Sequence, residues 1–276
     1  MRGKGRGVSM EYGCKDRLVV ISGGTSGIGL AAARLFYRDG ARVFLLGRSR
    51  ERGMAALTEL SALAPAGTTP RTAAGDGAAP APRLLYIHCD VARRADCQFA
   101  AALVEAYGGR ADIVVHSAGV YCEQDLLEAT EEDYRAVMDV NAGGTFFLTQ
   151  ALVPLLGEGG SIVTVASDAG LAGNRGCALY SASKGAVVAL TRSLALDLAP
   201  RIRVNCVCPG DVDTPLLERQ LDGADYTKAD MAFSYPLERL ATADEVAHVI
   251  AAVASPANSF MTGAIVPVDG GLMAQG

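Results

Sequence analysis

The sequence predicts a single α/β domain, in which helices flank a doubly wound, mostly parallel sheet of seven strands. Short apolar runs rich in Val and Ile recur along the chain, and segments with the period of a helix lie between them. A glycine-rich loop follows the first run. Alternating strands and helices favour a parallel sheet, because each crossover helix packs on a face of the sheet.

Each apolar run is typical of a buried parallel strand, which needs no alternation of polar and apolar residues. The expected buried strands are Leu18 to Ile21, Val43 to Leu46, Leu84 to Ile87, Ile113 to Val115, Ile162 to Val165 and Val204 to Val207. A last strand, Ala264 to Val268, contains Pro267, which cannot donate a backbone hydrogen bond, so we expect it at the sheet edge. Between the first two strands, apolar residues from Ile28 to Phe36 repeat at helical spacing and predict a helix that runs to Asp39 and Gly40.

Two segments differ from this pattern. Residues 1–15 carry basic residues but no apolar stretch, so we expect a flexible tail and not a secretory signal. Residues 64–83 are rich in Pro, Gly and Ala without periodicity, which predicts a disordered surface insertion. No other change in composition divides the chain, so residues 16–276 are expected to form one domain.

The composition argues against several classes of function. The net charge of −5 at pH 7 and the scattered Lys and Arg residues offer no basic surface to a nucleic acid. No apolar stretch reaches the roughly 18 residues of a membrane span. The seven cysteines lack C-x-x-C spacing and a nearby run of His, which favours reduced thiols in a cytoplasmic protein without a metal site. The expected partner is a small molecule.

The loop Ser22-Gly23-Gly24-Thr25-Ser26-Gly27-Ile28-Gly29 joins the first strand to the first helix. Glycines at such a turn let the backbone approach a pyrophosphate, which gains from the unpaired amides and the positive end of the helix dipole. An ordinary strand-to-helix turn is the alternative, because a glycine motif alone is weak evidence. The candidate cofactor-binding residues of this loop are Gly23, Thr25, Ser26, Gly27, Ile28 and Gly29.

Further motifs follow in order along the chain: Asp90-Val91, His116-Ser117-Ala118-Gly119, Asn141, Ser167, Tyr180-Ser181-Ala182-Ser183-Lys184 and Pro209-Gly210. Together with the G-x-x-x-G-x-G spacing of the loop, they resemble the short-chain dehydrogenase/reductase family over about Asp16 to Gly271. The resemblance implies an oxidoreductase that transfers a hydride between a nicotinamide cofactor and a carbonyl or alcohol carbon. It implies cofactor contacts at Asp90, Val91, Ser117, Ala118, Gly119, Tyr180, Lys184, Pro209, Gly210, Val212 and Thr214.

Three features depart from the family pattern, one of which is the insertion after Ala64. Ser22 stands where the family usually has Thr, and His116-Ser117 stands where it usually has Asn-Asn. Ser117 lacks the amide hydrogen bonds with which an Asn would hold the neighbouring strands and the cofactor, whereas the reacting groups are unaffected.

The candidate catalytic residues are Asn141, Ser167, Tyr180 and Lys184. Tyr180 and Lys184 lie four residues apart in a segment of helical period, so both side chains rise from one helix face. A phenol with a pKa of about 10 is a poor base at neutral pH, and an adjacent ammonium stabilises the phenolate. Tyr180 is therefore expected to be the acid and base, and Lys184 its activator. A surface pair on the helix is the alternative interpretation of this spacing alone.

Ser167 follows a strand, so its hydroxyl is expected at the carboxyl edge of the sheet, where it can bind the substrate oxygen. By resemblance, Lys184 also binds the nicotinamide ribose, and Asn141 holds, through its backbone or amide, a water that passes protons from Lys184 to solvent. A Ser-His-Asp hydrolase is disfavoured, because no G-x-S-x-G turn surrounds Ser167 and the histidines His88 and His116 lie at strand ends.

The end of the second expected strand distinguishes NADP from NAD. An acidic residue there would bind the ribose hydroxyls of NAD, but the chain has Gly47-Arg48-Ser49. Arg48 offers a planar charged group suited to a 2′-phosphate, so NADP(H) is the preferred cofactor, with Arg48 and Ser49 as contacts. If Arg48 only stacks on the adenine, NAD(H) remains usable.

Residues 211–235 form, by resemblance, a lid over the substrate. Apolar residues suit a hydrophobic ligand, whereas six acidic residues against one Arg and one Lys disfavour a highly anionic one. We therefore expect a neutral ketone, sterol-like or polyol substrate, unless these carboxylates are simply a solvated face. A 3-oxoacyl thioester reductase of fatty acid synthesis and a non-catalytic NADP(H) sensor are the alternatives. The resemblance also implies a homo-oligomer, a tetramer or a dimer.

Overall fold

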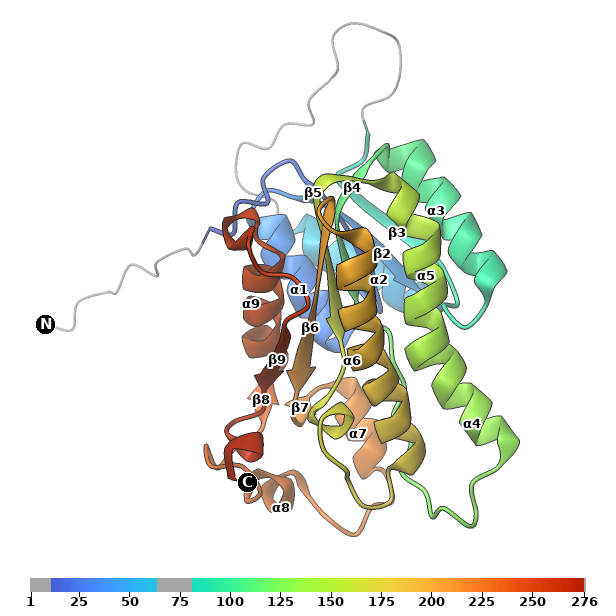
Figure 1. The fold of residues 1–276 in the computed structure, drawn as a ribbon, viewed down its shortest axis with the longest axis vertical. Coiled ribbons are helices and arrows are strands. Elements are labelled where there is room, and N and C mark those ends of the chain that lie inside the picture. The colour runs from blue at the N-terminus through green and yellow to red at the C-terminus, as the bar shows by residue number, and fades with distance from the viewer. Residues whose placement is uncertain (1–10, 64–80, 276) are drawn as a thin grey trace, which may run out of the picture.

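A seven-stranded sheet forms the centre of the computed structural model, which describes residues 11–63 and 81–275 (Figure 1). Its strand order is β3-β2-β1-β4-β5-β6-β9, and all of these neighbours pair in parallel. The strands are β1 (Leu18–Ser22), β2 (Arg42–Gly47), β3 (Leu84–His88), β4 (Ala111–His116), β5 (Leu156–Val165), β6 (Ile202–Pro209) and β9 (Ile265–Val268). The predicted doubly wound fold is confirmed.

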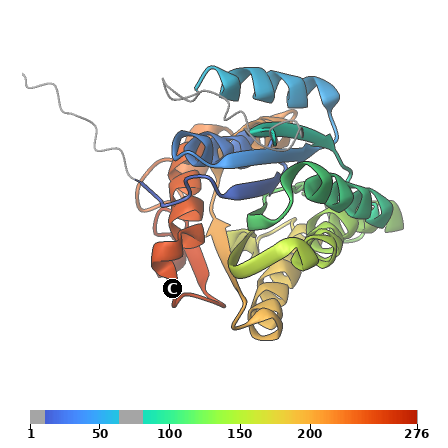
Figure 2. The same ribbon diagram turned by 90° about the horizontal axis from the view of Figure 1, so that it is seen from above.

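Helices cover both faces of the sheet, giving three layers (Figure 2). One face packs against α1 (Gly27–Arg38), α2 (Arg50–Ser61) and α9 (Ala243–Ala254). The other packs against α3 (Arg94–Gly108), α5 (Gly144–Leu152) and α6 (Ala178–Leu198). The helix α4 (Glu131–Met138) precedes α5, and the short helices α7 (Pro215–Leu221) and α8 (Lys228–Ala232) lie beyond the carboxyl end of β6.

The strand register brings the ends of the central strands to one edge. Ser22 of β1 pairs with His116 of β4, and His116 pairs with Thr164 of β5. The loops that follow these three strands therefore leave the sheet side by side, as in other open parallel sheets that bind ligands at this edge.

Pro267 lies in the edge strand, as predicted. β9 pairs only with β6, where Pro267 stands opposite Cys208. An edge strand leaves one row of backbone groups without a partner in the sheet, so the missing proline N–H removes no inner hydrogen bond.

The last residues of the predicted flexible tail, 1–15, belong to the fold. Tyr12 and Cys14 are buried, and their backbone amides donate to the two carboxylate oxygens of Asp39, at 3.1 and 2.7 Å. The Ser255 hydroxyl donates to the carbonyl of Tyr12, at 2.8 Å. These contacts fix residues 11–15 to the end of α1 and of α9, and residues 1–10 lie outside the described part of the chain.

The last residue of the predicted insertion, 64–83, also belongs to the fold. Most of it, residues 64–80, lies outside the described residues, but Arg83 belongs to the fold. Its carbonyl accepts from the Val43 amide at 2.7 Å, its guanidinium donates to the Gly40 carbonyl at 2.8 Å, and that guanidinium lies 5.5 Å from the centre of the Tyr37 ring. These bonds lead the chain into β3.

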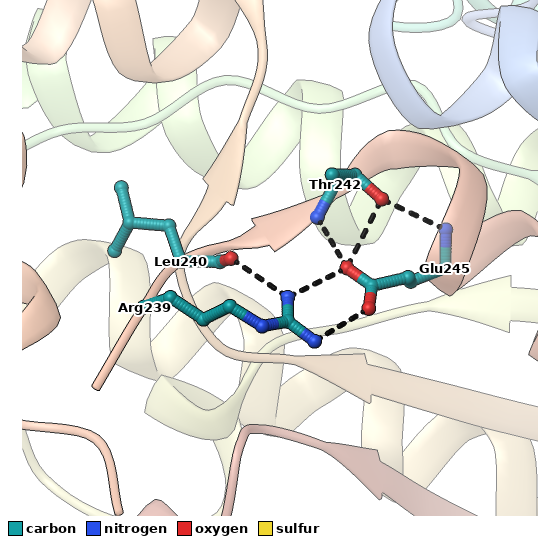
Figure 3. A network of polar contacts seen from close by, with 4 residues as sticks. All are labelled: Arg239, Leu240, Thr242 and Glu245. Carbon is teal, nitrogen blue, oxygen red and sulfur yellow. Dashed lines mark hydrogen bonds and ion pairs between the residues drawn. The ribbon is translucent and has the colours of Figure 1, made fainter. Parts of the chain in front are cut away.

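A small polar network fixes the chain where it returns to α9 (Figure 3). Arg239 donates to both carboxylate oxygens of Glu245, at 2.9 and 2.7 Å, and Glu245 accepts from the Thr242 amide at 2.9 Å. The arginine and these bonds hold the pKa of Glu245 down, at about 2. Thr242 belongs to β8 (Ala241–Thr242), which pairs with β7 (Val212–Asp213), so the network secures both ends of segment 211–235.

Within the described ranges no helix is long and apolar enough to cross a membrane. All seven cysteines fall in these ranges, and none forms a disulfide.

Candidate active site

The glycine loop has the close contacts that only glycine allows. Gly23 has a φ of +67°, and a Cβ atom there would lie 2.7 Å from the Ala118 nitrogen. A Cβ on Gly29 would lie 2.4 Å from the carbonyl oxygen of Gly23. The loop is thus pressed against the end of β4 and the start of α1, and Ser26, which precedes α1, makes no capping bond with its side chain. The first amides of α1 have no partner within the helix and can bind an anion.

A cleft of about 100 Å³ lies between this loop and the end of β2. Gly47 places no acidic side chain in the cleft, and a Cβ atom there would lie 3.1 Å from the Thr25 side chain, a tight contact. Three exposed arginines, Arg48, Arg52 and Arg219, line the cleft instead. None of the three forms an ion pair with an acidic residue in the part of the chain that the structure describes. The cleft therefore suits a phosphate-bearing nucleotide, as the sequence indicated.

The residues predicted to bind the cofactor fall into three groups. The cleft is lined by Gly23, Thr25, Ser26, Arg48, Val91, Ala118 and Gly119. A second cavity, of about 280 Å³, is lined by Ile28, Ser117, Gly119, Tyr180, Lys184, Pro209, Gly210, Val212 and Thr214. Gly119 lines both, so the two cavities meet there.

Four predicted contacts line neither cavity: Gly27, Gly29, Ser49 and Asp90. The two glycines shape the loop. Ser49 caps α2 by accepting from the Arg52 amide at 3.2 Å, and Asp90 accepts from the Ala92 amide at 3.2 Å. Ser49 and Asp90 thus act on the local turns in this structure.

Tyr180, Lys184 and Ser167 lie together in the larger cavity. Tyr180 and Lys184 are one turn apart on α6, as predicted, and each is more than nine-tenths buried. The Lys184 ammonium donates to the Val165 carbonyl at 3.1 Å and lies 5.7 Å from the centre of the Tyr180 ring. The pair is part of a cavity wall and not of the helix surface.

Burial dominates the electrostatics of this pair. It lowers the pKa of Lys184 to about 8, and it raises the pKa of Tyr180 above its ordinary value. The Ser167 hydroxyl lowers the pKa of Tyr180, whereas the charges of Asp168 and Asp211 raise it. The Lys184 ammonium, which lies over the ring and is bonded to Val165, is not among the groups that shift this pKa in the protein alone, so its activation of Tyr180 stays a prediction. The Tyr180 phenol is thus protonated at neutral pH and is poised to donate a proton.

The Ser167 hydroxyl has a partner that the sequence analysis did not predict. It donates to the Oδ1 atom of Asp168, at 2.7 Å, and accepts from the Ala169 amide, at 3.2 Å. The Ser167 hydroxyl must therefore turn its proton away from Asp168 before it can donate that proton to a substrate oxygen.

Asn141 lies in a single π-helical turn, Asp139–Gly143, between α4 and α5. Its side-chain amide donates to the Val120 carbonyl (3.0 Å) and to Ser183 Oγ (2.9 Å), and its Oδ1 accepts from the Val120 amide (2.9 Å). The side chain thus joins the end of β4 to α6. The backbone carbonyl accepts from Thr145 Oγ1 at 2.7 Å, and both it and Oδ1 have a second lone pair that could bind the predicted water.

The residues that depart from the family pattern form their own bonds. Ser22 accepts from the amide of Ala118 through its hydroxyl, at 3.4 Å, and from the amide of Ser117 through its carbonyl, at 3.1 Å. His116 shares a 2.8 Å hydrogen bond with Thr149, and burial lowers its pKa to about 4. His116 is therefore a neutral core residue that ties β4 to α5, not a base.

Sequence reasoning missed the polar wall opposite Tyr180. It consists of Tyr121, Glu123, Asp168, Asp211 and Tyr226. Glu123 accepts from the hydroxyls of Tyr121 (3.0 Å) and Tyr226 (2.7 Å), and the rings of Tyr121 and Tyr180 meet edge to face at 4.9 Å. The run Pro209-Gly210-Asp211 was the one available signal, because it placed an acidic residue directly after a strand.

Comparisons with known proteins agree with this geometry. The family model described as Enoyl-(Acyl carrier protein) reductase matches residues 23–273. The chain is 35% identical over 262 residues to the 3-oxoacyl-(acyl-carrier-protein) reductase of Thermotoga maritima, which covers 94% of this chain and 98% of that protein. It is also 35% identical over 261 residues to the meso-2,3-butanediol dehydrogenase of Serratia marcescens, covering 94% and 95% respectively.

A solved structure is similarly close. The short-chain dehydrogenase/reductase of Brucella melitensis named glucose/ribitol dehydrogenase matches with a TM-score of 0.83 and 34% identity, over 95% of this chain and 99% of that chain.

The burial of Lys184 predicts how stability depends on pH. The pKa of Lys184 is about 8 in the fold, below its ordinary value of 10.5. Between these two pH values Lys184 is therefore protonated in the unfolded chain and largely neutral in the folded protein. The contribution of Lys184 to the free energy of unfolding therefore rises with pH through this window. We expect Lys184→Met to be more stable than wild type at about pH 7, with the difference shrinking by about pH 10. Urea unfolding of both proteins checks this; a constant difference would contradict it.

Proposed function

The chain belongs to the short-chain dehydrogenase/reductase family, and we propose that it transfers a hydride between NADP(H) and a carbonyl or secondary alcohol carbon, with Tyr180 as acid and base. It is an oxidoreductase of that family, which uses NAD(P)(H) and acts on CH–OH or C=O groups. The observation that supports the proposal most directly is the meeting of the two cavities at Gly119, because it sets Tyr180 beside the cleft that suits the nucleotide.

The residues of the larger cavity have distinct roles in this proposal. In reduction, Tyr180 donates its proton to the carbonyl oxygen, and Ser167 binds the same oxygen as negative charge develops on it. Lys184, held by Val165, supplies positive charge near the tyrosine ring and returns a proton to the phenolate. The bound nicotinamide supplies the hydride at the carbon. Burial excludes water and strengthens each of these interactions.

The preference for NADP(H) over NAD(H) rests on the three arginines of the cleft. Gly47 stands where an acidic residue would bind a free ribose hydroxyl, and Arg48, Arg52 and Arg219 line the same space without acidic partners among the described residues. Arg219 comes from α7, so the cleft is closed in part by segment 211–235, the proposed lid. NAD(H) lacks the 2′-phosphate and is expected to bind more weakly.

The favoured substrate is a small neutral carbonyl compound or alcohol. Relatives named for an acyl thioester, a diol and a sugar or sugar alcohol match the chain about equally well, so they do not select among these classes. A 3-oxoacyl thioester on an acidic carrier needs a group of basic residues beside the cavity. Among the described residues, Arg175 is the one exposed basic side chain that lines the cavity, since Arg219 lines the nucleotide cleft and Lys228 is paired with Asp213. A non-catalytic NADP(H) sensor would not require the buried Tyr180, Ser167 and Lys184 in one cavity.

Turnover tests the proposed reaction. We expect purified protein to oxidise NADPH in the presence of a ketone, and Tyr180→Phe to lower kcat by at least about a hundredfold, because the proton donor is removed. Absorbance of the reduced nicotinamide measures both. Tyr107→Phe, at an exposed position on α3, is the matched control and should keep wild-type activity. NADPH binding without turnover of any ketone, sugar, steroid or thioester would favour the sensor.

Nucleotide binding tests the cofactor preference. Arg48→Ala and Arg219→Ala should each raise the Kd for NADPH by about tenfold to a hundredfold and change the Kd for NADH little, because each removes a charge-assisted bond to the 2′-phosphate. Calorimetric titration gives both constants. Arg192→Ala, an exposed arginine of α6 outside the cleft, is the control. Equal weakening of both nucleotides would contradict the assignment.

We also propose a homo-oligomer, a dimer or tetramer. Large apolar side chains are exposed on α3 and α5, at Phe99 and Phe146, and after α9, at Phe260. A second copy would remove such side chains from water. Light scattering of the purified protein should give a mass of two or four chains, and a monomer would contradict the proposal.

A further inference from the structure

Two carboxylates in the active-site cavity have no role in the proton and hydride transfers described above. Asp168 follows Ser167 directly, and Asp211 lies across the cavity, just after β6. Asp168 is 8% exposed, and Asp211 is half-buried. Carboxylates in such positions lose hydration, so each needs hydrogen-bond donors to offset the cost.

The protein supplies donors to only one oxygen of each carboxylate. Asp168 Oδ1 accepts from Ser167 Oγ at 2.7 Å and from the Ala169 amide at 2.8 Å. Asp211 Oδ2 accepts from the Tyr235 hydroxyl at 2.7 Å. Within residues 11–63 and 81–275, no group donates to Asp168 Oδ2 or to Asp211 Oδ1. Both oxygens are acceptors left for a ligand.

The surrounding charges decide what kind of donor fits. Burial raises the pKa of both aspartic acids, the charge of Asp168 raises the pKa of Asp211 further, and the charge of Asp269 raises the pKa of Asp168. Arg175 and Lys184 line the same cavity and offset this negative charge in part, and Glu123 already accepts from two tyrosine hydroxyls. The cavity therefore has no large excess of negative charge that would call for a cation, and a neutral hydroxyl supplies the missing donor.

The position of Asp168 indicates which carbon of the substrate carries that hydroxyl. A substrate oxygen that bonds to Tyr180 and Ser167 lies next to the Asp168 carboxylate, because Ser167 Oγ and Asp168 Oδ1 are already in contact. A hydroxyl on the neighbouring carbon is the nearest further donor that such a substrate can offer to the two carboxylates, which line the same cavity as Tyr180.

Resting on the oxidoreductase function proposed above, we propose that Asp168 and Asp211 bind a second substrate hydroxyl, on the carbon next to the reacting one. The substrates are then an α-hydroxy ketone and the corresponding vicinal diol. In reduction, the carbonyl carbon gains a hydride from NADPH and its oxygen gains the proton of Tyr180, giving the diol and NADP⁺. The second hydroxyl keeps its own proton and donates it in a hydrogen bond to the carboxylates.

A set of three-carbon substrates tests this assignment. Acetone, hydroxyacetone and aminoacetone differ only in the donor next to the carbonyl. We expect kcat/KM for hydroxyacetone to exceed that for acetone by at least about tenfold, the usual effect of one hydrogen bond to a charged group. Equal values for acetone and hydroxyacetone would overturn the proposal. A higher value for aminoacetone than for hydroxyacetone would overturn the assignment of a neutral hydroxyl.

Variants show whether the two carboxylates cause the preference. Asp168→Asn and Asp211→Ala should each lower the ratio of kcat/KM for hydroxyacetone to that for acetone by about tenfold. Asp213→Asn removes a carboxylate of the same segment outside the cavity and is the matched control, with an unchanged ratio. The Kd for NADPH and the unfolding midpoint of each variant show that it is folded. A ratio that stays constant in both active-site variants would overturn the proposal.

A binding measurement separates this inference from the proposed reaction. Tyr180→Phe loaded with NADP⁺ should bind propane-1,2-diol at least about tenfold more tightly than propan-2-ol, as measured by NMR titration. Equal affinities would overturn the role of the carboxylates even if wild type reduces ketones. If wild type reduces no carbonyl compound, the proposed reaction fails, while tighter diol binding would still support the carboxylate site.

Discussion

The parallel register of β1, β4 and β5 determines where the groups of the candidate site lie. Ser22, His116 and Thr164 stand at one level across these strands, so the glycine loop, the Ser117–Gly119 turn and Ser167 leave the sheet at one edge. The contacts of Gly23 and Gly29 then press the loop against the end of β4, and Asn141 ties that end to α6. Because α6 carries Tyr180 and Lys184, the same set of strand ends and the helix α6 position both the nucleotide cleft and the catalytic cavity.

Desolvation determines the protonation of the ionisable groups in the catalytic cavity. It keeps Tyr180 protonated, lowers the pKa of Lys184 toward neutrality and raises the pKa of Asp168 and Asp211. A substrate that brings an oxygen to Tyr180 and a hydroxyl to the carboxylates supplies the partners that these groups lack in the protein alone. Catalysis and substrate selection thus depend on the same loss of water from one cavity.

The fold and much of the site could be predicted from the sequence, because their signals are local. The apolar runs specify buried strands, and the spacing of Tyr180 and Lys184 places them on one helix face. Contacts between distant segments could not be predicted. Tyr12 and Cys14 are held by Asp39, and Asp168 and Asp211 face one cavity only because β5 and β6 are neighbours. The bond from Lys184 to the Val165 carbonyl likewise joins α6 to β5, and no sequence pattern indicates it.

The transfer of deuterium from cofactor to product tests the central claim most directly. Protein incubated with NADPH deuterated at the transferable position of the nicotinamide and with hydroxyacetone in ordinary water should give propane-1,2-diol with one deuterium on the carbinol carbon, detected by mass spectrometry. That result would show direct hydride transfer from NADPH to the carbonyl carbon. A diol without deuterium, or no diol at all, would contradict the account.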